Sequence, residues 1–208
     1  MKIAVLVSGS GSNLQALIDA RLSGQIVGVI SNKPDAYALA RAKAAEITTA
    51  VIEHKHYPDR ESFDAVMHQQ LVDWDVDLVV LAGFMRILTP QFVAAWQGKM
   101  LNIHPSLLPH YKGMHTHQRV LKTGDVWHGC TVHYVTAELD AGQALAQGVI
   151  RVSQQDDLAS LAARVHALEH LVYPQVVEWI CTGTLAHTAQ GVVFRNQPMT
   201  QPIQFSQI

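Results

Sequence analysis

Two polar side chains near the middle of the chain follow a short apolar run and suit acyl chemistry. The segment Leu101–Pro109 reads LNIHPSLLP, and Pro105 blocks any regular continuation of a strand beyond His104. If residues 99–103 form a strand, its alternation directs Asn102 and His104 to the same side at its carboxyl end. An amide can stabilise a developing oxyanion and an imidazole can move a proton, so the pair suits acyl transfer. On these two residues alone, a simple strand-end cap explains the pattern equally well.

A second candidate site lies at the start of the chain, in a loop rich in glycine and serine. Residues 2–7 form an apolar run typical of a buried parallel strand, and the loop SGSGSN at 8–13 follows at once. Apolar spacing then predicts a helix that opens near Ser12 or Asn13. Backbone N–H groups at a helix start bind phosphate, and glycines let the backbone approach the anion. The loop lacks the ending of a Walker A loop, and Leu14 breaks GxGxxG, so a tight turn without a ligand is the alternative.

The elements that must position these residues alternate between strands and helices along the first half of the chain. The predicted strands are 2–7, 26–31, 51–52, 77–82 and 99–103, and the predicted helices start near 12 and cover 37–46, 60–72 and 90–96. This alternation predicts an α/β fold, Rossmann-like, with a mostly parallel twisted sheet flanked by helices. Such sheets bind ligands at the carboxyl ends of their strands, where Asn102 and His104 are expected.

The second half is less regular. Its predicted elements are a helix at 115–122 ended by Gly124, strands at 131–135 and 144–152, a long helix from about 157 and two short strands within 184–208. The segment 136–142 joins the two longer strands and carries Glu138 and Asp140, so it would bring acids to the sheet. Pro174 falls inside the apolar stripe of the long helix and predicts a kink.

Composition excludes several classes of protein. The net charge of −2 gives no sign of a nucleic-acid surface, although a local basic pocket for a small anion is compatible with it. No apolar run is long enough for a signal peptide or a membrane span, and Cys130 and Cys181 are far apart, so we expect a cytoplasmic protein with reduced thiols. The 12 histidines include H-x-H pairs at 54–56 and 115–117 but no HExxH, and surface or loop histidines are favoured over a metal site.

Four motifs now stand in one order along the chain. They are SGSGSN at 8–13, LAGFMRIL at 81–88, NIHPSLLP at 102–109 and ELDAG at 138–142. The set closely resembles the phosphoribosylglycinamide formyltransferases, the folate-dependent glycinamide ribonucleotide transformylases of purine synthesis. The resemblance runs from about residue 1 to about 181. The NxHPSLLP stretch with a later Asp is shared more widely among 10-formyltetrahydrofolate enzymes, whereas the first loop and the GMHTH segment at 113–117 are more particular.

The resemblance implies a role for each residue that matches the family pattern. Asn102, His104 and Asp140 would be the catalytic trio. The phosphate of glycinamide ribonucleotide would be held by Gly11, Ser12 and Asn13. The rest of that substrate would meet His166, Ala167, Leu168 and Glu169, with Glu169 on its ribose side. The 10-formyltetrahydrofolate co-substrate would be bordered by Arg60, Met85, Arg86, Ile87, Leu88, Asn102, Thr136, Ala137, Glu138, Leu139 and Asp140.

The resemblance also implies how the chain is divided into parts and which partners it binds. Residues 1–181 would form the catalytic domain, with a phosphate-binding half at about 1–100 and a folate and catalytic half at about 101–181. Residues 182–208 would be an extension that either packs on the domain or is partly mobile. The partners would be the two small-molecule substrates, with no metal, nucleic acid or membrane, and the protein would be a monomer or homodimer. Gln143 departs from the Pro expected after Ala-Gly in many relatives, which concerns the stiffness of the loop.

Each assignment has a simpler alternative. Arg60 and Glu169 could be solvated helix residues, Arg86 could pair with a surface acid, and Asp140 could start a turn before Gly142. At the level of function, the rival enzymes are other formyl-folate enzymes, a hydrolase or an aminoacyl-tRNA formyltransferase, which are expected to carry extra domains. A Rossmann-like module that senses a nucleotide without turnover is the rival of a different class, and the intact trio argues against it.

Overall fold

The chain divides into two units at the strand that carries Asn102 and His104. In the computed structural model, which describes residues 1–206, the first unit spans Met1–Asn102 and the second begins at Ile103. The strand β5 (Met100–His104) contributes residues to both units. It starts and ends one residue later than predicted, so His104 belongs to the strand itself.

Parallel strands form the sheet of the first unit. Its strands are β1 (Lys2–Val7), β2 (Gln25–Ser31), β3 (Thr49–Val51), β4 (Leu78–Leu81) and the start of β5, in the order β5–β4–β1–β2–β3. The residues of β4 and all but the first residue of β1 are buried, as expected for parallel strands covered on both faces. The mostly parallel α/β class predicted from the sequence is confirmed, although β3 starts two residues earlier than expected.

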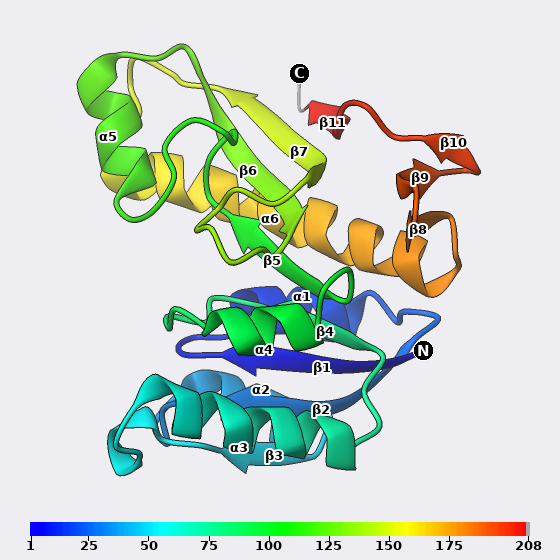
Figure 1. Ribbon diagram of the computed structural model, residues 1–208. Helices are drawn as coiled ribbons and strands as arrows, with labels where there is room; N and C mark the ends of the chain where they lie inside the picture. The colour runs from blue at the N-terminus through cyan, green and yellow to red at the C-terminus, as the bar shows by residue number, and fades with distance from the viewer. Residues whose placement is uncertain (207–208) are drawn as a thin grey trace. The chain divides into compact units, whose positions relative to one another are not determined.

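Helices cover both faces of this sheet. They are α1 (Ser12–Asp19), α2 (Tyr37–Ala44), α3 (Arg60–Asp73) and α4 (Pro90–Ala95), with a 3₁₀ turn at His54–His56. Figure 1 shows α1 and α2 on one face and α3 and α4 on the other, and each pair is in mutual contact. The helix starts are set by local chemistry, since Asp59 caps α3, Thr89 caps α4 and Pro90 occupies the first turn of α4.

The second unit is built on an antiparallel pair of strands. Its larger elements are α5 (Thr116–Thr123), β6 (Trp127–Tyr134), β7 (Ala144–Arg151) and α6 (Leu158–Cys181). The helix α6 packs on both strands, and β11 (Ile203–Ser206) adds to β7 as a parallel neighbour. The strands β8 (Leu185–Thr188), β9 (Gly191–Phe194) and β10 (Gln197–Pro198) form a small antiparallel sheet, and β8 contacts α6 (Figure 1).

Two features of the second unit differ from the sequence prediction. The strand β6 begins at Trp127, four residues before the predicted start. Its first four residues, 127–130, pair with residues 148–151 at the far end of β7. Residues 184–206 contain four short strands rather than two, and one of them, β10, has only two residues. The helix α6 runs through Pro174 to Cys181 as one element, and the kink predicted at Pro174 stays a prediction.

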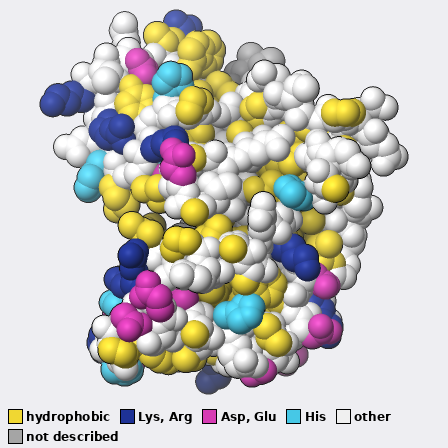
Figure 2. Space-filling model, viewed as in Figure 1, with side chains coloured by type: hydrophobic (Ala, Val, Ile, Leu, Met, Phe, Trp, Pro, Cys, Tyr) yellow, Lys and Arg dark blue, Asp and Glu magenta, His cyan; other side chains and the backbone are white. Residues whose placement is uncertain are grey.

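Charge is dispersed on the molecular face drawn in Figure 2, where acidic and basic side chains are interspersed rather than gathered by sign. Within residues 1–206, no helix is both long enough and apolar enough to cross a bilayer.

Candidate active site

The loop before α1 adopts a conformation that requires glycine. Gly11 has φ = 72° and is the N-cap of α1, which begins at Ser12 as predicted. A Cβ atom on Gly11 would lie 2.6 Å from the Cβ of Ala38 in α2, closer than side chains approach. The loop carbonyls are tied to α2, because Ala38 N–H donates to Gly9 O and Arg41 Nε donates to Ser10 O. The amide groups at the start of α1 therefore sit on a fixed loop, the arrangement that phosphate binding needs.

Ser8, which sequence reasoning did not single out, joins three strand ends in the first unit. Its hydroxyl donates to Asn32 Oδ1 at 2.6 Å and accepts from the Met85 N–H at 2.8 Å. Asn32 follows β2 and Met85 follows β4, so one buried hydroxyl sets the path of the segment 85–88. In that segment Met85 and Ile87 are 61% and 62% exposed, whereas Leu88 is buried. Two neighbouring exposed apolar side chains are suited to an apolar ligand surface.

Arg60 stands exposed at the first position of α3. A cation in the first turn of a helix opposes the helix dipole, so this residue does not stabilise its own helix. Its charge acts on Asp64, one turn further along. Asp64 is buried and accepts from the Thr89 N–H at 2.6 Å, and burial raises the pKa of its carboxyl despite that bond and despite Arg60. This contact fixes α3 against the residues that follow Leu88.

The second unit brings His104 and Asp140 together, as the resemblance implied. Nδ1 of His104 lies 3.4 Å from Oδ2 of Asp140, and the two side chains are only 7% and 6% exposed. Asp140 adopts φ = 50°, a left-handed conformation that Asp and Asn tolerate better than most residues. Its Oδ2 also accepts from the Gly113 N–H at 2.8 Å. The pair is thus supported by backbone from the loop that follows β5.

The other ring nitrogen of His104 faces a backbone carbonyl. Nε2 lies 2.9 Å from the oxygen of Tyr111, which can only accept a hydrogen bond. Both ring nitrogens therefore face acceptors, and only the charged imidazolium can donate to both. Sequence reasoning did not foresee this contact. It follows that donation from His104 to a substrate requires the Tyr111 carbonyl to move away.

A second histidine lies beside Asp140. Nε2 of His133 is 3.8 Å from Oδ1 of Asp140, too long for a direct hydrogen bond, and its Nδ1 donates to Tyr134 O at 2.9 Å. Burial lowers the pKa of His133, against the opposing effect of Asp140.

The predicted substrate segment of α6 presents two exposed and two buried side chains. His166 and Ala167 are exposed, whereas Leu168 and Glu169 are 1% and 4% exposed. Leu168 packs against Gly148 of β7, so its side chain belongs to the core. Burial and, secondarily, the charge of Glu169 raise the pKa of the Cys130 thiol and of the Tyr173 phenol. Glu169 is buried, so the alternative that it is a solvated helix residue is wrong.

The remaining predicted residues form the loop after β6. Thr136, Ala137, Glu138 and Leu139 are exposed, and Leu139 presents 54% of its surface, whereas the neighbouring Asp140 is buried. Glu138 pairs with Lys112 at 3.0 Å. The loop therefore offers an exposed rim with the buried acid at its end.

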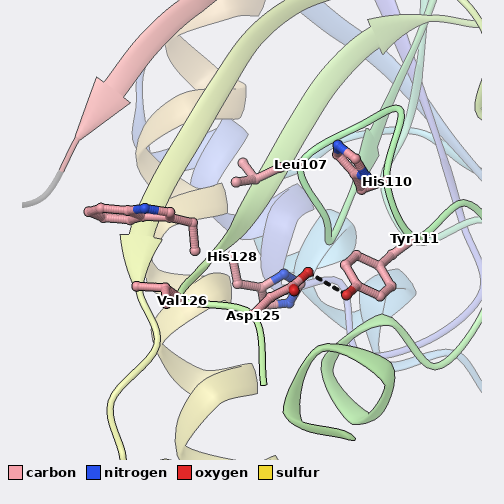
Figure 3. Close-up of a pocket in the computed structure, with 7 residues that line it drawn as sticks. Leu107, His110, Tyr111, Asp125, Val126 and His128 are labelled. Carbon is pink, nitrogen blue, oxygen red and sulfur yellow. Dashed lines mark hydrogen bonds between the residues drawn. The ribbon is translucent and has the colours of Figure 1, made fainter. Parts of the chain in front are cut away.

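A cavity of about 260 Å³ lies beside the loop that carries the Tyr111 carbonyl. Its lining residues, none of which was predicted as a site residue, are Leu107, His110, Tyr111, Asp125, Val126, Trp127 and His128. Figure 3 shows the Tyr111 hydroxyl directed at the Asp125 carboxylate, to which it donates, and that hydroxyl is also 2.6 Å from Thr123 Oγ1. The side chain of Tyr111 thus anchors the segment whose carbonyl meets His104.

Several histidines are buried, so the expectation of surface or loop histidines is wrong for His128 and His133, which are 1% and 2% exposed. Nε2 of His128 is 2.9 Å from Nδ1 of His117. Burial lowers the pKa of His128 to about 4 and lowers that of His117, and each is further lowered by neighbouring histidines. Among the side chains of residues 1–206, no group of three His, Cys, Asp or Glu is arranged to hold a metal ion.

The chain is similar to known proteins over nearly its whole length. It is 46% identical over 189 residues to the phosphoribosylglycinamide formyltransferase of Escherichia coli, with 89% of each chain covered. The solved structure of a phosphoribosylglycinamide formyltransferase from Coxiella burnetii matches with a TM-score of 0.94 and 44% identity, over 99% of each chain.

Longer relatives match over a small part of their own length. The chain is 47% identical to a segment of the human trifunctional purine biosynthetic protein adenosine-3 and spans 19% of it. It spans 14% of the corresponding protein of Chironomus tentans. A family model described as formyl transferase matches residues 1–177, and the chain accordingly belongs to the formyl transferase family.

Proposed function

We propose that this protein transfers the formyl group of 10-formyltetrahydrofolate to the amine of glycinamide ribonucleotide, a step of de novo purine synthesis in the cytoplasm. The observation that carries the proposal is the buried His104–Asp140 pair, with Nδ1 and Oδ2 3.4 Å apart, in a chain that aligns with 89% of the Escherichia coli formyltransferase. A buried acid beside an imidazole is an arrangement for proton transfer.

The predicted folate segments have surfaces that suit such a ligand. Met85 and Ile87 in the first unit and Leu139 in the second are large apolar residues, each more than half exposed. Exposed apolar side chains that lie near one another, such as Met85 and Ile87, mark surfaces suited to a ligand. Bound 10-formyltetrahydrofolate supplies a formyl group already activated by its carrier, so the proposal requires no metal.

The residues of the trio divide the work. Asn102 donates its amide to the formyl oxygen as negative charge develops there, an effect worth about 3 kcal/mol for a comparable donor. Once its Nε2 is released from Tyr111 O, the neutral His104 ring takes the proton that the attacking amine loses and passes it to the tetrahydrofolate nitrogen as the bond from that nitrogen to the formyl carbon breaks. Asp140 faces Nδ1 of His104 at 3.4 Å and holds the ring in one orientation.

The first unit supplies the acceptor's anchor. The loop of Gly11, Ser12 and Asn13 binds the phosphate through backbone amides at the start of α1. Glu169, on α6 of the second unit, is proposed for the ribose side. A phosphate anchor distinguishes glycinamide ribonucleotide from water, the acceptor of a hydrolase.

The decisive experiment offers the purified protein three acceptors with 10-formyltetrahydrofolate and no added metal. These are glycinamide ribonucleotide, water alone and initiator aminoacyl-tRNA. We expect formyl transfer to glycinamide ribonucleotide, and release of tetrahydrofolate that depends on the presence of this acceptor. Equal release without an acceptor would indicate a hydrolase, and binding of nucleotide without any turnover would indicate a sensing module.

A further inference from the structure

One buried glutamine in the second unit joins three separate segments. Gln147 lies in β7 and is 9% exposed. Its Nε2 donates to Leu108 O at 2.8 Å and to Thr131 Oγ1 at 3.1 Å, and its Oε1 accepts from Gln204 Nε2 at 3.1 Å. Both donor hydrogens of the amide are used, and the Leu108 carbonyl can only accept, so the orientation of the amide is fixed.

The contacts of Gln147 reach the segment that follows His104. Thr131 Oγ1 donates to Ser106 O at 2.7 Å and accepts from the Leu108 N–H at 3.0 Å as well as from Gln147, which uses its full hydrogen-bonding capacity. Ser106 N–H donates to His104 O at 2.8 Å. The backbone from His104 to Leu108 is therefore held by the Thr131 hydroxyl and the side-chain amide of Gln147.

The same segment leads to the carbonyl that meets the His104 ring. Ser106 Oγ donates to His110 O at 2.7 Å, and Tyr111 O lies 2.9 Å from His104 Nε2. A shift of residues 106–108 would consequently be transmitted to Tyr111. The placement of the imidazole depends on that path.

The third contact of Gln147 comes from the end of the described chain. Gln204 lies on β11, directly opposite Gln147 in the parallel pairing with β7. Its amide hydrogen bond gives Gln147 Oε1 a donor and leaves the Nε2 of Gln147 free to face Leu108. A nearby contact ties the loop that carries Asp140 to the C-terminal segment, because Gln143 Nε2 donates to Met199 O at 3.2 Å. This gives the residue that departs from the family pattern a partner in the C-terminal extension.

We propose that Gln147 and Gln204 are positioning residues for the catalytic histidine. The C-terminal strand β11 sets the orientation of the Gln147 amide, and Gln147 fixes the loop that fixes His104. The inference rests on the proposed formyl transfer and adds residues outside the trio and outside the predicted substrate sites.

The test reverses the polarity of the Gln204 contact in the full chain. Gln204→Glu has nearly the same shape but places acceptor atoms against Gln147 Oε1, which favours a flipped amide that no longer donates to Leu108. Gln204→Lys keeps a donor at this position. Gln201→Glu, at an exposed position of the same segment, is the matched control for added negative charge.

Two quantities are measured for each variant, together with its thermal midpoint. They are the kcat and KM of formyl transfer, and the hydrogen-exchange rate of the Leu108 amide without substrates. We expect Gln204→Glu to lower kcat about tenfold, because a slightly misplaced catalytic group loses part of its effect on the rate. The KM for glycinamide ribonucleotide should stay within about twofold, because the loop misplaces a proton carrier rather than the phosphate site. Leu108 exchange should rise in Gln204→Glu, and Gln204→Lys should restore both quantities.

The outcomes separate the inference from the function on which it rests. An active parent whose Gln204→Glu variant is folded and matches the Gln201→Glu control in kcat and in Leu108 exchange would overturn the inference alone. Equal losses in the Glu and Lys variants, in step with their thermal midpoints, would also overturn it, since they would report general destabilisation. A parent without turnover would overturn the proposed function and this inference with it.

Discussion

The imidazole of His104 is held between two oxygens, Oδ2 of Asp140 at 3.4 Å and the Tyr111 carbonyl at 2.9 Å. The acid arrives from the loop after β6 and the carbonyl from the loop after β5. A ring fixed at both nitrogens cannot rotate freely, so its orientation is set before any substrate arrives. In the proposed reaction the contact with Asp140 keeps this orientation while the Tyr111 carbonyl releases Nε2.

The first prediction concerns Asn102 and His104. Asn102→Ala should lower kcat by roughly 10² to 10³, the scale for loss of one oxyanion donor. His104→Ala should lower it at least as much, because it removes a proton carrier as well. The double variant should lose less than the product of the single losses, since both residues act on one reacting centre. Near-normal steady-state turnover of His104→Ala would remove this mechanism.

The second prediction isolates the charge of Asp140. Asn tolerates the left-handed conformation of this residue, so Asp140→Asn should stay folded while kcat falls by about 10² or more. Asp140→Ala should lose, in addition, about 1 kcal/mol of folding stability, because Ala is strained at φ = 50°. Kinetics and denaturant unfolding of the two variants check both statements. Full activity in Asp140→Asn would show that the carboxylate charge has no part in turnover.

The third prediction tests the loop before α1 as a phosphate site. Gly11 is unsuited to this test, because any side chain there would collide with Ala38 and disturb the fold whether or not phosphate binds. Ser12→Asp adds a negative charge in the first turn of α1, which favours the helix but repels phosphate. The KM for glycinamide ribonucleotide should rise about 10- to 100-fold, which corresponds to the free energy of one hydrogen bond to a charged group. The KM for the folate should stay nearly unchanged.

Gln91→Glu makes the same change of charge in the exposed first turn of α4 and should leave both KM values alone. Inorganic phosphate should compete with the nucleotide in the parent and weakly in Ser12→Asp. If Ser12→Asp binds the nucleotide normally, the loop is a structural turn and the phosphate lies elsewhere.

The fourth prediction concerns acid stability. Burial and neighbouring histidines lower the pKa of His128 from 6.5 to about 4 and lower the pKa of its partner His117. Because the pKa of His128 is lower in the folded protein than in the unfolded chain, protonation of this ring favours unfolding. The folding stability is therefore fully present above about pH 6.5 and is lost as the pH falls towards 4. The thermal midpoint should therefore fall less between pH 7 and pH 4.5 in His128→Gln than in the parent, while His56→Gln, an exposed position, should follow the parent. Parallel curves for all three proteins would contradict this account.

The parts of the fold that sequence patterns predict are those determined locally. The apolar run 2–7, the glycine loop and α1 were all anticipated, because a buried strand, a left-handed glycine and a helix start each leave a signal within a few residues. The alternation of strands and helices likewise predicted the parallel class of the first unit. His104 and Asp140 were paired through a resemblance, and the structure brings them together.

The parts that escaped prediction depend on contacts between distant segments. The Tyr111 carbonyl and the Gly113 amide meet the pair only because of the path of the loop after β5, and backbone groups carry no sequence signal. The strand β11 was missed for a similar reason. Its four residues lie in a stretch rich in glutamine, and only pairing with β7 makes them a strand.

The pairing of β11 with β7 also bears on how the protein behaves in solution. β7 is a mostly buried strand with β6 on one side and β11 on the other. An uncovered edge of such a strand offers unpaired backbone groups to the strands of other molecules and promotes aggregation. The four residues Ile203–Ser206 cover this edge with a shorter, partly exposed strand, so a chain shortened before Ile203 should be less soluble.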